Sequence, residues 1–230
     1  MPLLDRNTVS NSFVGPAGLG HGPCGDRIPP GFKALESVYG VLLKSDLRGR
    51  NDVVNQFSIK WDIPAPAASS TFWIYMGIML ENCETFGSIT VWKGSPLAQN
   101  QWAMAGGFYD QTVLLDITPG MILPTGHTIM GDVFRDQRNY WILDTYDGKV
   151  KMPVRLIKRV PKEAHWVYVA LEMTDGGANP ALYPRSEGIK FYDIRINDEK
   201  ANLEWIDMYR KPCITDIVQD DDSVFVKWSP

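Results

Sequence analysis

The sequence predicts an all-β protein, an antiparallel double-sheet jelly roll or β-sandwich. Short runs rich in Val, Ile, Phe, Tyr and Trp recur about every ten to fifteen residues, and Gly, Pro, Asn or Asp bounds each of them. Turn-forming stretches such as TPG, PTGHT, YDGK and TDGG lie between the runs. No segment carries a sustained helical period. This regular alternation of strand and turn is typical of sandwiches and jelly rolls.

The expected strands of the first half follow a start that is rich in Gly and Pro. Residues 1–35 include VGPAGLGHGPCG and predict an irregular arm, which precedes a single β-sandwich domain at 36–230. The runs in this half are VYGVLLKS at 38–45, NQFSIKWDIP at 55–64, STFWIYMGIML at 70–80, GSITVWKG at 87–94 and TVLLDITPG at 112–120. Each is rich in β-branched and aromatic residues, and the last ends in the turn sequence TPG.

The second half continues the same pattern with six further runs. They are HTIMGDVFR at 127–135, YWILDTYDGK at 140–149, KMPVRLIKRV at 151–160, AHWVYVALEM at 164–173, IKFYDIRI at 189–196 and SVFVKW at 223–228. The sequences PTGH, DG, TDGG and DDDS supply the turns that separate them. The stretches VVNQF and ANLEWIDMYRK are too short or too mixed to predict helices.

Composition excludes several classes of protein. The 230 residues are 44% hydrophobic and 22% charged, which is ordinary for a globular chain with a full core. A net charge of −4 argues against nucleic-acid binding, and three cysteines are too few for a disulfide scaffold. No run approaches eighteen apolar residues, so we expect no membrane span. The N-terminal stretch lacks a basic segment followed by an apolar one, so we expect no secretory signal and a cytoplasmic location.

Familiar catalytic and ligand-binding motifs are missing. The sequence contains no G-x-S-x-G, no P-loop and no G-x-G-x-x-G. The three histidines (His21, His127 and His165) do not have zinc-ligand spacing, and Asp220–Asp222 lacks the spaced oxygens of a calcium loop. We therefore expect neither a metal nor a cofactor.

Two residues carry nucleophile or acid–base chemistry in principle. A thiolate at Cys83 needs a neighbouring base, and the fold could bring His165 to it; a packed, inert thiol is the alternative. His165 begins the run HWVYVALEM, where it is either a polar end to an apolar strand face or an acid–base group on a pocket wall.

The tryptophans and tyrosines are more informative. Because side chains alternate along a strand, Trp73 and Tyr75 share one face, and Trp166 and Tyr168 share a face opposite Val169. Such pairs can form the core between two sheets. A sandwich has only one interior, however, so aromatic residues on the other face predict a ligand-binding groove.

Several motifs keep the order and spacing of one known family. The early run ends in Ile63-Pro64, the run FWIYMGIMLENCET holds Gly77-Ile78 and then Cys83, and LPTGHTIMGDV follows. With AHWVYVALE and GIKFYDIRI, these motifs resemble the fungal glutamic peptidases, or eqolisins, from about Val38 to Trp228. The resemblance implies a two-sheet jelly roll like that of concanavalin A.

The catalytic pair of that family is not kept. The family sets a Gln and a Glu on its concave sheet, where the Glu activates water and the Gln helps to hold the oxyanion. Those positions fall at Ile89 and Val169, whose alkyl side chains do neither. Glu172 lies three residues beyond Val169, so strand alternation would turn it to the opposite face. The resemblance thus implies a divergent, non-proteolytic member.

Other departures make the expected cleft more apolar. A supporting Asp of the family falls at Met79, and an aromatic-acidic pattern becomes WAMAGG around Trp102. Small residues at Ala105, Gly106 and Gly107 would open space. Together these changes predict an apolar cavity with aromatic walls.

The leading hypothesis is a cofactor-free enzyme of secondary-metabolite biosynthesis, a cyclase or pericyclase such as a Diels–Alderase. It would hold a small apolar or aromatic substrate at reacting distance. The expected ligand-binding residues are Trp73, Tyr75, Ile89, Trp102, Met104 and Val169, with His165 as the catalytic polar group.

Three alternatives stay open. The groove could belong to a lectin-like carbohydrate-binding module, to a glutamic peptidase with a shifted register, or to a scaffold without a ligand. The oligomeric state is also open, a homo-oligomer included.

Overall fold

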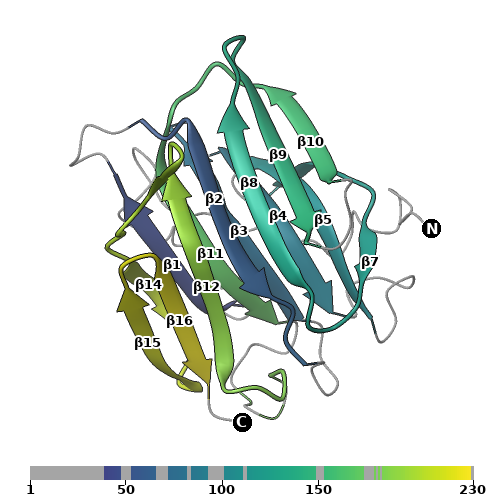
Figure 1. Ribbon diagram of the computed structural model, residues 1–230, viewed down its shortest axis with the longest axis vertical. Helices are drawn as coiled ribbons and strands as arrows, with labels where there is room; N and C mark the ends of the chain where they lie inside the picture. Colours follow the sequence, from purple (N-terminus) through teal and green to yellow (C-terminus); the bar gives the residue numbers. More distant parts are fainter. Residues whose placement is uncertain are drawn as a thin grey trace.

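We describe the fold from a computed structural model of the chain. The structure describes residues 39–47, 53–65, 72–81, 84–92, 101–110, 113–148, 153–173, 179, 181 and 183–228. The strands in these segments form two antiparallel sheets that pack as a sandwich (Figure 1). The predicted fold class is therefore confirmed. The predicted arm at residues 1–35 lies outside the described residues.

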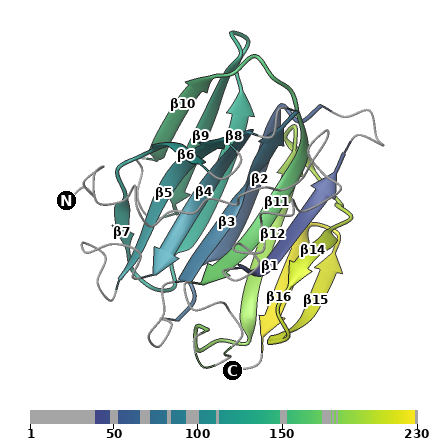
Figure 2. The same cartoon turned by 180° about the vertical axis from the view of Figure 1, so that it is seen from behind.

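Sheet A is the sheet nearer the reader in Figure 2. Its strands are β1 (Tyr39–Asp46), β3 (Phe72–Leu80), β4 (Glu84–Trp92), β5 (Trp102–Asp110), β6 (Val113–Ile117), β7 (Met121–Leu123), β11 (Ala164–Met173) and β14 (Ile206–Arg210). They run in the order β14-β1-β11-β3-β4-β5-β6, and β7 pairs with β5.

Sheet B lies in front in Figure 1. Its strands are β2 (Gln56–Asp62), β8 (Thr128–Arg135), β9 (Tyr140–Asp147), β10 (Val154–Arg159), β12 (Gly188–Ile196), β13 (Glu199–Lys200), β15 (Ile214–Asp220) and β16 (Ser223–Trp228). They run in the order β10-β9-β8-β2-β12-β16-β15, and β13 pairs with β12.

Each expected run contains an observed strand, and five observed strands were not expected: β5, β7, β13, β14 and β15. β5 has the sequence WAMAGGFYD, and Ala and Gly have low β propensity. It becomes a strand because β4 pairs with it along its whole length, from Glu84 with Asp110 to Trp92 with Trp102. β14 and β15 are edge strands, and β15 is polar along most of its length, so neither has the apolar alternation that identifies a half-buried strand.

Aromatic side chains from both sheets fill the interior of the sandwich. Phe72 of β3 lies edge-on to Trp102 of β5 and to Trp228 of β16, with ring centroids 6.3 and 5.9 Å apart. Edge-to-face pairs of this kind add to the stabilisation that burial of the rings already gives. The interior therefore sets how the two sheets lie against each other.

Three close approaches across the interior show which side chains of sheet A point at sheet B. The hydroxyls of Ser88 on β4 and Thr145 on β9 share a hydrogen bond of 2.6 Å. A Cβ at Gly131 of β8 would lie 2.5 Å from Met76 Sδ, so Met76 also points at sheet B. A Cβ at Gly106 would lie 2.7 Å from a Leu143 methyl group, which places Gly106 on the same side.

The other face of sheet A, which points away from sheet B, is called the outer face here. It receives the residues that alternate with the inward ones. On the four central strands these are Trp73, Tyr75, Gly77, Met79, Thr85, Gly87, Ile89, Val91, Ala103, Ala105, Gly107, Trp166, Tyr168, Ala170 and Glu172. The outer face is turned toward the reader in Figure 2.

The central strands of sheet A are buried on both faces, whereas those of sheet B are buried on one. All nine residues of β3 are buried, and so are eight of the nine in β4. In sheet B, buried and more exposed residues alternate along β8 and through the first part of β10. Alternation is the pattern of a sheet with one solvated face, and an uninterrupted buried run is the pattern of a strand covered on both faces.

A row of three glycines crosses the middle of the outer face. Gly77, Gly87 and Gly107 are paired in register on β3, β4 and β5. A Cβ at Gly77 would meet the Phe86 carbonyl oxygen and would lie 2.7 Å from the Tyr168 hydroxyl, and a Cβ at Gly87 would also meet that hydroxyl. The glycines therefore form a trough, and the Tyr168 side chain lies over the first two of them.

We expect Gly77→Ala to lower the free energy of unfolding by about 2–3 kcal/mol, because the added methyl group overlaps the backbone of β4 and displaces the Tyr168 hydroxyl. Gly148→Ala is the control, since its nearest neighbour, the Thr128 carbonyl oxygen, is 3.4 Å away, and we expect a change within about 0.5 kcal/mol. Urea denaturation measures both. A Gly77→Ala protein as stable as the wild type would contradict this account of the trough.

Candidate functional site

The outer face of sheet A combines an apolar surface with a single buried carboxyl group at one corner. Cross-strand pairing sets Tyr75 between Ala170 and Ile89, and sets Trp73 between Glu172 and Val91. All six of these side chains are at least 98% buried. This face is therefore dry, aromatic and aliphatic.

Glu172 is the acidic group of this surface. Its side chain lies among apolar neighbours on β11, and the whole residue is 2% exposed. Burial raises the pKa of Glu172 from 4.5 to about 8, although a hydrogen bond with the Tyr75 hydroxyl favours the ionised form. The carboxyl group is thus mostly protonated at neutral pH, and a neutral carboxyl group can donate a hydrogen bond as well as accept one.

Several polar atoms on the outer face have no hydrogen-bond partner among the described residues. Among them are Glu172 Oε2, the Trp73 indole nitrogen Nε1, the Tyr168 hydroxyl and the Thr85 hydroxyl. The Tyr168 hydroxyl lies near Thr85, but the two do not form a well-shaped hydrogen bond, and burial raises the pKa of Tyr168. Buried polar atoms are nearly always paired in folded proteins, so these atoms need an explanation, as do the unpaired indole nitrogens of Trp61 and Trp102 in the core.

The structure separates the six expected ligand-binding residues into two groups. Trp73, Tyr75 and Ile89 lie together on the outer face. Trp102, Met104 and Val169 belong to the core cluster between the two sheets. The second group therefore supports the sheet from within and does not line the same surface as the first.

The positions of Val169 and Glu172 are the reverse of the expectation. Val169 pairs with Met76, which points at sheet B, so Glu172, three residues on, points to the outer face with Tyr75 and Ile89. The pairing of β11 with β3 is irregular between Ala164 and Trp166, where an extra residue is accommodated. A one-residue irregularity of this kind turns every later side chain to the other face.

The expected catalytic residue, His165, lies at that irregularity, seven residues before Glu172. Its side chain is 23% exposed, and its Nε2 is 3.7 Å from the carboxylate of Glu163, which is half-exposed. It also lies edge-on to the Trp166 ring. The structure therefore does not bring His165 to the Tyr75–Glu172 corner. Cys83 lies outside the described residues.

The small residues that were expected to open space do so only in part. Gly106 faces the interior, where Leu143 fills the space above it. Ala105 and Gly107 lie on the outer face, beside Ile89 and Gly87. The floor of the candidate site is thus the strip that runs from Ala105 across Ile89 toward Tyr75.

Polar clusters in sheet B are already paired. Asp144 is 1% exposed and accepts hydrogen bonds from Nε and Nη2 of Arg155, at 2.7 and 2.6 Å, and one from the Tyr146 hydroxyl. His127 Nδ1 lies 2.8 Å from Asp147 Oδ2. These groups satisfy one another, so they stabilise the sheet. No group of three potential metal ligands occurs among the described residues.

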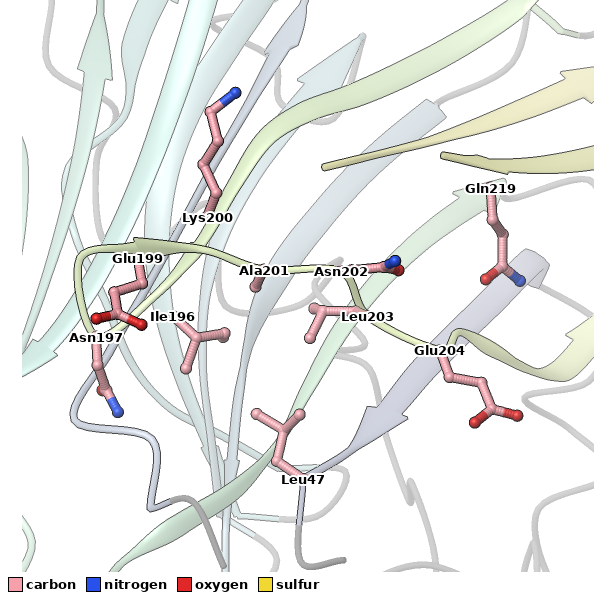
Figure 3. A pocket seen from close by; sticks show the side chains of 10 residues that line it. All are labelled: Leu47, Ile196, Asn197, Glu199, Lys200, Ala201, Asn202, Leu203, Glu204 and Gln219. Atoms are coloured by element: carbon pink, nitrogen blue, oxygen red, sulfur yellow. The ribbon is translucent and has the colours of Figure 1, made fainter. Parts of the chain in front are cut away.

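A cavity of about 560 Å³ lies elsewhere, between the end of β1 and the turn that joins β12 to β13 (Figure 3). The turn has positive φ at Asn197 and Asp198, as in a tight hairpin of type I′. The Asn197 amide binds the backbone of Val53, Asn55 and Gln56, and the Gln219 amide binds both backbone groups of Trp205. Two of the amides that line this cavity therefore hold the chain in place.

Comparisons with solved structures identify the same fold in glutamic peptidases. Scytalido-glutamic peptidase bound to a peptide-based transition-state analogue matches 84% of this chain and 99% of its own, with a TM-score of 0.56 and 12% identity. SCP-B, a member of the eqolisin family in complex with the tripeptide Ala-Ile-His, has the same coverage, a TM-score of 0.52 and 11% identity. The fold is eqolisin-like. At these identities the likeness establishes the fold and not the activity.

The sequence comparisons add no closer relative. No family model matches this chain, and no curated protein matches it. Among the described residues, no helix is long and apolar enough to cross a membrane.

We expect the stability of the protein to fall as the pH rises from about 5 to about 8. The unfolded chain releases the Glu172 proton near pH 4.5, whereas the folded protein keeps it up to about pH 8. The resulting loss of unfolding free energy is on the order of 4 kcal/mol, at about 1.4 kcal/mol for each unit of pKa. Glu172→Gln is neutral at every pH, so it removes this part of the dependence.

Urea denaturation of both proteins between pH 5 and pH 9 measures the difference. Glu187→Gln, at an exposed position, is the control and should follow the wild type. Parallel profiles for the wild type and Glu172→Gln would mean that the folded protein does not hold Glu172 neutral.

Proposed function

We propose that this protein is a cofactor-free biosynthetic enzyme, a cyclase or pericyclase such as a Diels–Alderase. Its substrate would be a small apolar or aromatic natural-product intermediate that binds against the outer face of sheet A. The observation that carries the proposal is the set of unpaired polar atoms within this buried aromatic surface. An apolar surface with a few convergent polar groups is how proteins bind and orient such molecules.

In the proposed binding site, the outer-face residues have three roles: aromatic walls, an apolar floor and a polar group. Trp73 and Tyr75 provide aromatic walls, and Ile89 with Ala105 provides the floor. Glu172 takes the polar role that sequence analysis assigned to His165. A pericyclic or cyclisation step needs two fragments held at reacting distance, and a hydrogen-bond donor that polarises one of them lowers the barrier further.

The chemistry at Glu172 differs from that of a glutamic peptidase. Activation of water requires an ionised carboxylate as the base, whereas burial keeps Glu172 largely protonated at neutral pH. Ile89 lies on the same face, and its alkyl side chain cannot donate a hydrogen bond to an oxyanion. A protonated acid beside an apolar floor suits proton donation to a neutral substrate.

One observation nevertheless keeps a hydrolytic function as the second candidate. Glu172 lies on the outer face with Tyr75 and Ile89, as a glutamic peptidase with a shifted register requires. Such an enzyme would cleave casein, and Glu172→Gln would abolish the cleavage. Absence of cleavage between pH 2 and pH 8 would exclude this candidate.

Thermal-shift and tryptophan-fluorescence titrations test the leading proposal. The panel contains small aromatic and polyketide-like compounds, together with matched sugars and a peptide. An apolar compound well above its dissociation constant should raise the melting temperature, because it binds only the folded protein. A shift with sugars alone would favour a lectin-like module and overturn the proposal.

Two isoleucine truncations locate the binding surface. Ile89→Ala should weaken binding of the apolar compound about tenfold, because it removes a buried alkyl contact worth roughly 1.5 kcal/mol. Ile74→Ala is the matched control, since Ile74 is equally buried but points into the interior of the sandwich from neighbouring β3. Both variants should lose stability, and only the first should lose affinity. Equal losses of affinity would place the ligand elsewhere.

A further inference from the structure

The large apolar side chains that stay exposed lie on the edge strands of the two sheets. Three are exposed among the described residues: Ile157 at 49%, Ile206 at 46% and Val218 at 41%. Ile206 belongs to β14 at an edge of sheet A, whereas Ile157 and Val218 belong to β10 and β15, which are the two edges of sheet B (Figure 1). Among the described strands each of these pairs with a single neighbour, so an edge of backbone N–H and C=O groups is open on its other side.

The open edge at β10 is basic. Val154 and Leu156 belong to the core cluster, so their side chains point into the sandwich. The residues that alternate with them or follow in the same phase are Arg155, Ile157 and Arg159, and all three are exposed on the solvated face of sheet B. Two positive charges therefore flank one exposed apolar side chain along this edge.

The open edge at β15 has the same pattern with the opposite charge. Ile217 packs against the core cluster, so its side chain points inward. The residues in the opposite phase are Asp216, Val218 and Asp220, and all three are exposed on the solvated face of sheet B. Two negative charges therefore flank one exposed apolar side chain here.

The charges at the two edges are only partly neutralised within the chain. Arg155 binds a carboxylate of β9 through Nε and Nη2, and its guanidinium carries further N–H donors on Nη1. Asp216 Oδ2 lies 3.9 Å from the Lys227 ammonium, at the limit of an ion pair. No ion pair among the described residues involves Arg159 or Asp220. These charges are therefore open to a second chain.

The strand order determines how the two edges can meet. Every neighbouring pair in sheet B is antiparallel, and β10 and β15 are six steps apart, so they run in the same direction. A second copy set beside β15 in the same orientation brings its β10 parallel to β15, with both solvated faces on one side. One register then forms three complementary pairs: Ile157 with Val218, Arg159 with Asp220, and Arg155 with Asp216.

We propose that copies of this chain associate head to tail, with β10 of one copy extending sheet B at β15 of the next. Charges on edge strands commonly prevent pairing, and here they set like charges together only when β10 meets β10 or β15 meets β15. Where β10 meets β15, the charges attract. Because the contact joins two different surfaces, a dimer keeps an open edge at each end and can add further copies.

Sedimentation velocity of the full chain, over a wide range of protein concentration, measures this association. A single strand pair buries less than about 1,200 Å², so the contact should be weak and should require a high concentration. The weight-average mass should rise above that of one chain, and added salt should lower it because salt screens the edge charges. A protein that remains monomeric at high concentration and low salt overturns the proposal.

Two charge reversals test which edges meet. Arg159→Glu and Asp220→Lys each set like charges side by side, so each variant alone should have a dissociation constant at least about tenfold higher than that of the wild type. An equal mixture should associate again, because the unchanged β15 of the first variant meets the unchanged β10 of the second. Association of either variant like the wild type, or no recovery in the mixture, overturns the proposal.

Lys190→Glu and Glu187→Lys are the matched controls. They make the same changes of charge at exposed positions that lie outside β10 and β15. Both should associate like the wild type, and circular dichroism checks that every variant is folded. If the controls weaken association as much as the edge variants do, the net charge controls it and the proposed strand pair is wrong.

Two double variants test the register. Arg159→Glu combined with Asp220→Lys in one chain restores opposite charges in the parallel arrangement, so this protein should associate. Arg159→Glu combined with Asp216→Lys leaves like charges facing each other and should stay monomeric. Recovery in the second double variant instead of the first would indicate antiparallel strands and overturn the head-to-tail arrangement. None of these residues lies on the outer face of sheet A, so the result is independent of the proposed function.

Discussion

Burial of sheet A on both faces is the constraint on which the rest of the structure depends. One face packs against sheet B and forms the core, and the other is equally dry. Strands in this position must be apolar along their whole length, as β3 and most of β4 are. Where a large side chain crosses the sheet, its neighbours must be small, which is why Tyr168 lies over Gly77 and Gly87. A polar group placed here has no water to bind.

Burial on both faces of sheet A determines the protonation state of Glu172. The same carboxyl group on the half-exposed face of sheet B would be ionised and hydrated, or paired with a cation as Asp144 is with Arg155. On the outer face of sheet A it keeps its proton at neutral pH, and its one hydrogen-bond partner among the described residues is Tyr75. Burial thus converts a base into a neutral donor without help from a charged neighbour. The indole nitrogen of Trp73, on the residue paired with Glu172, is likewise buried without a hydrogen-bond partner among the described residues.

Sequence reasoning reached the fold class and most strands, because β-branched runs between turn residues are a local signal. It missed β5, whose Ala- and Gly-rich sequence becomes a strand only through pairing with β4. It grouped Trp73 and Tyr75 correctly but reversed Val169 and Glu172, since parity along β11 depends on an irregularity near Trp166 that no local pattern reveals. Alternation of polar and apolar residues does not reveal which way a side chain points where both faces of the strand are apolar. The sequence feature that could have identified Glu172 was a lone Glu inside an otherwise apolar run.

The two faces of sheet A have different roles in the structure. The contacts that hold the sheets together, such as Ser88 with Thr145 and Met76 with Gly131, all lie on the inner face. The outer face contributes no contact to that interface, so its residues can differ between chains without changing the contacts between the two sheets, although the glycines under Tyr168 must stay small. A chain at 12% identity can therefore keep the eqolisin-like architecture and carry Ile89 on its outer face beside a protonated Glu172. We propose that the function of this chain resides on the outer face, where polar groups are buried in an apolar surface.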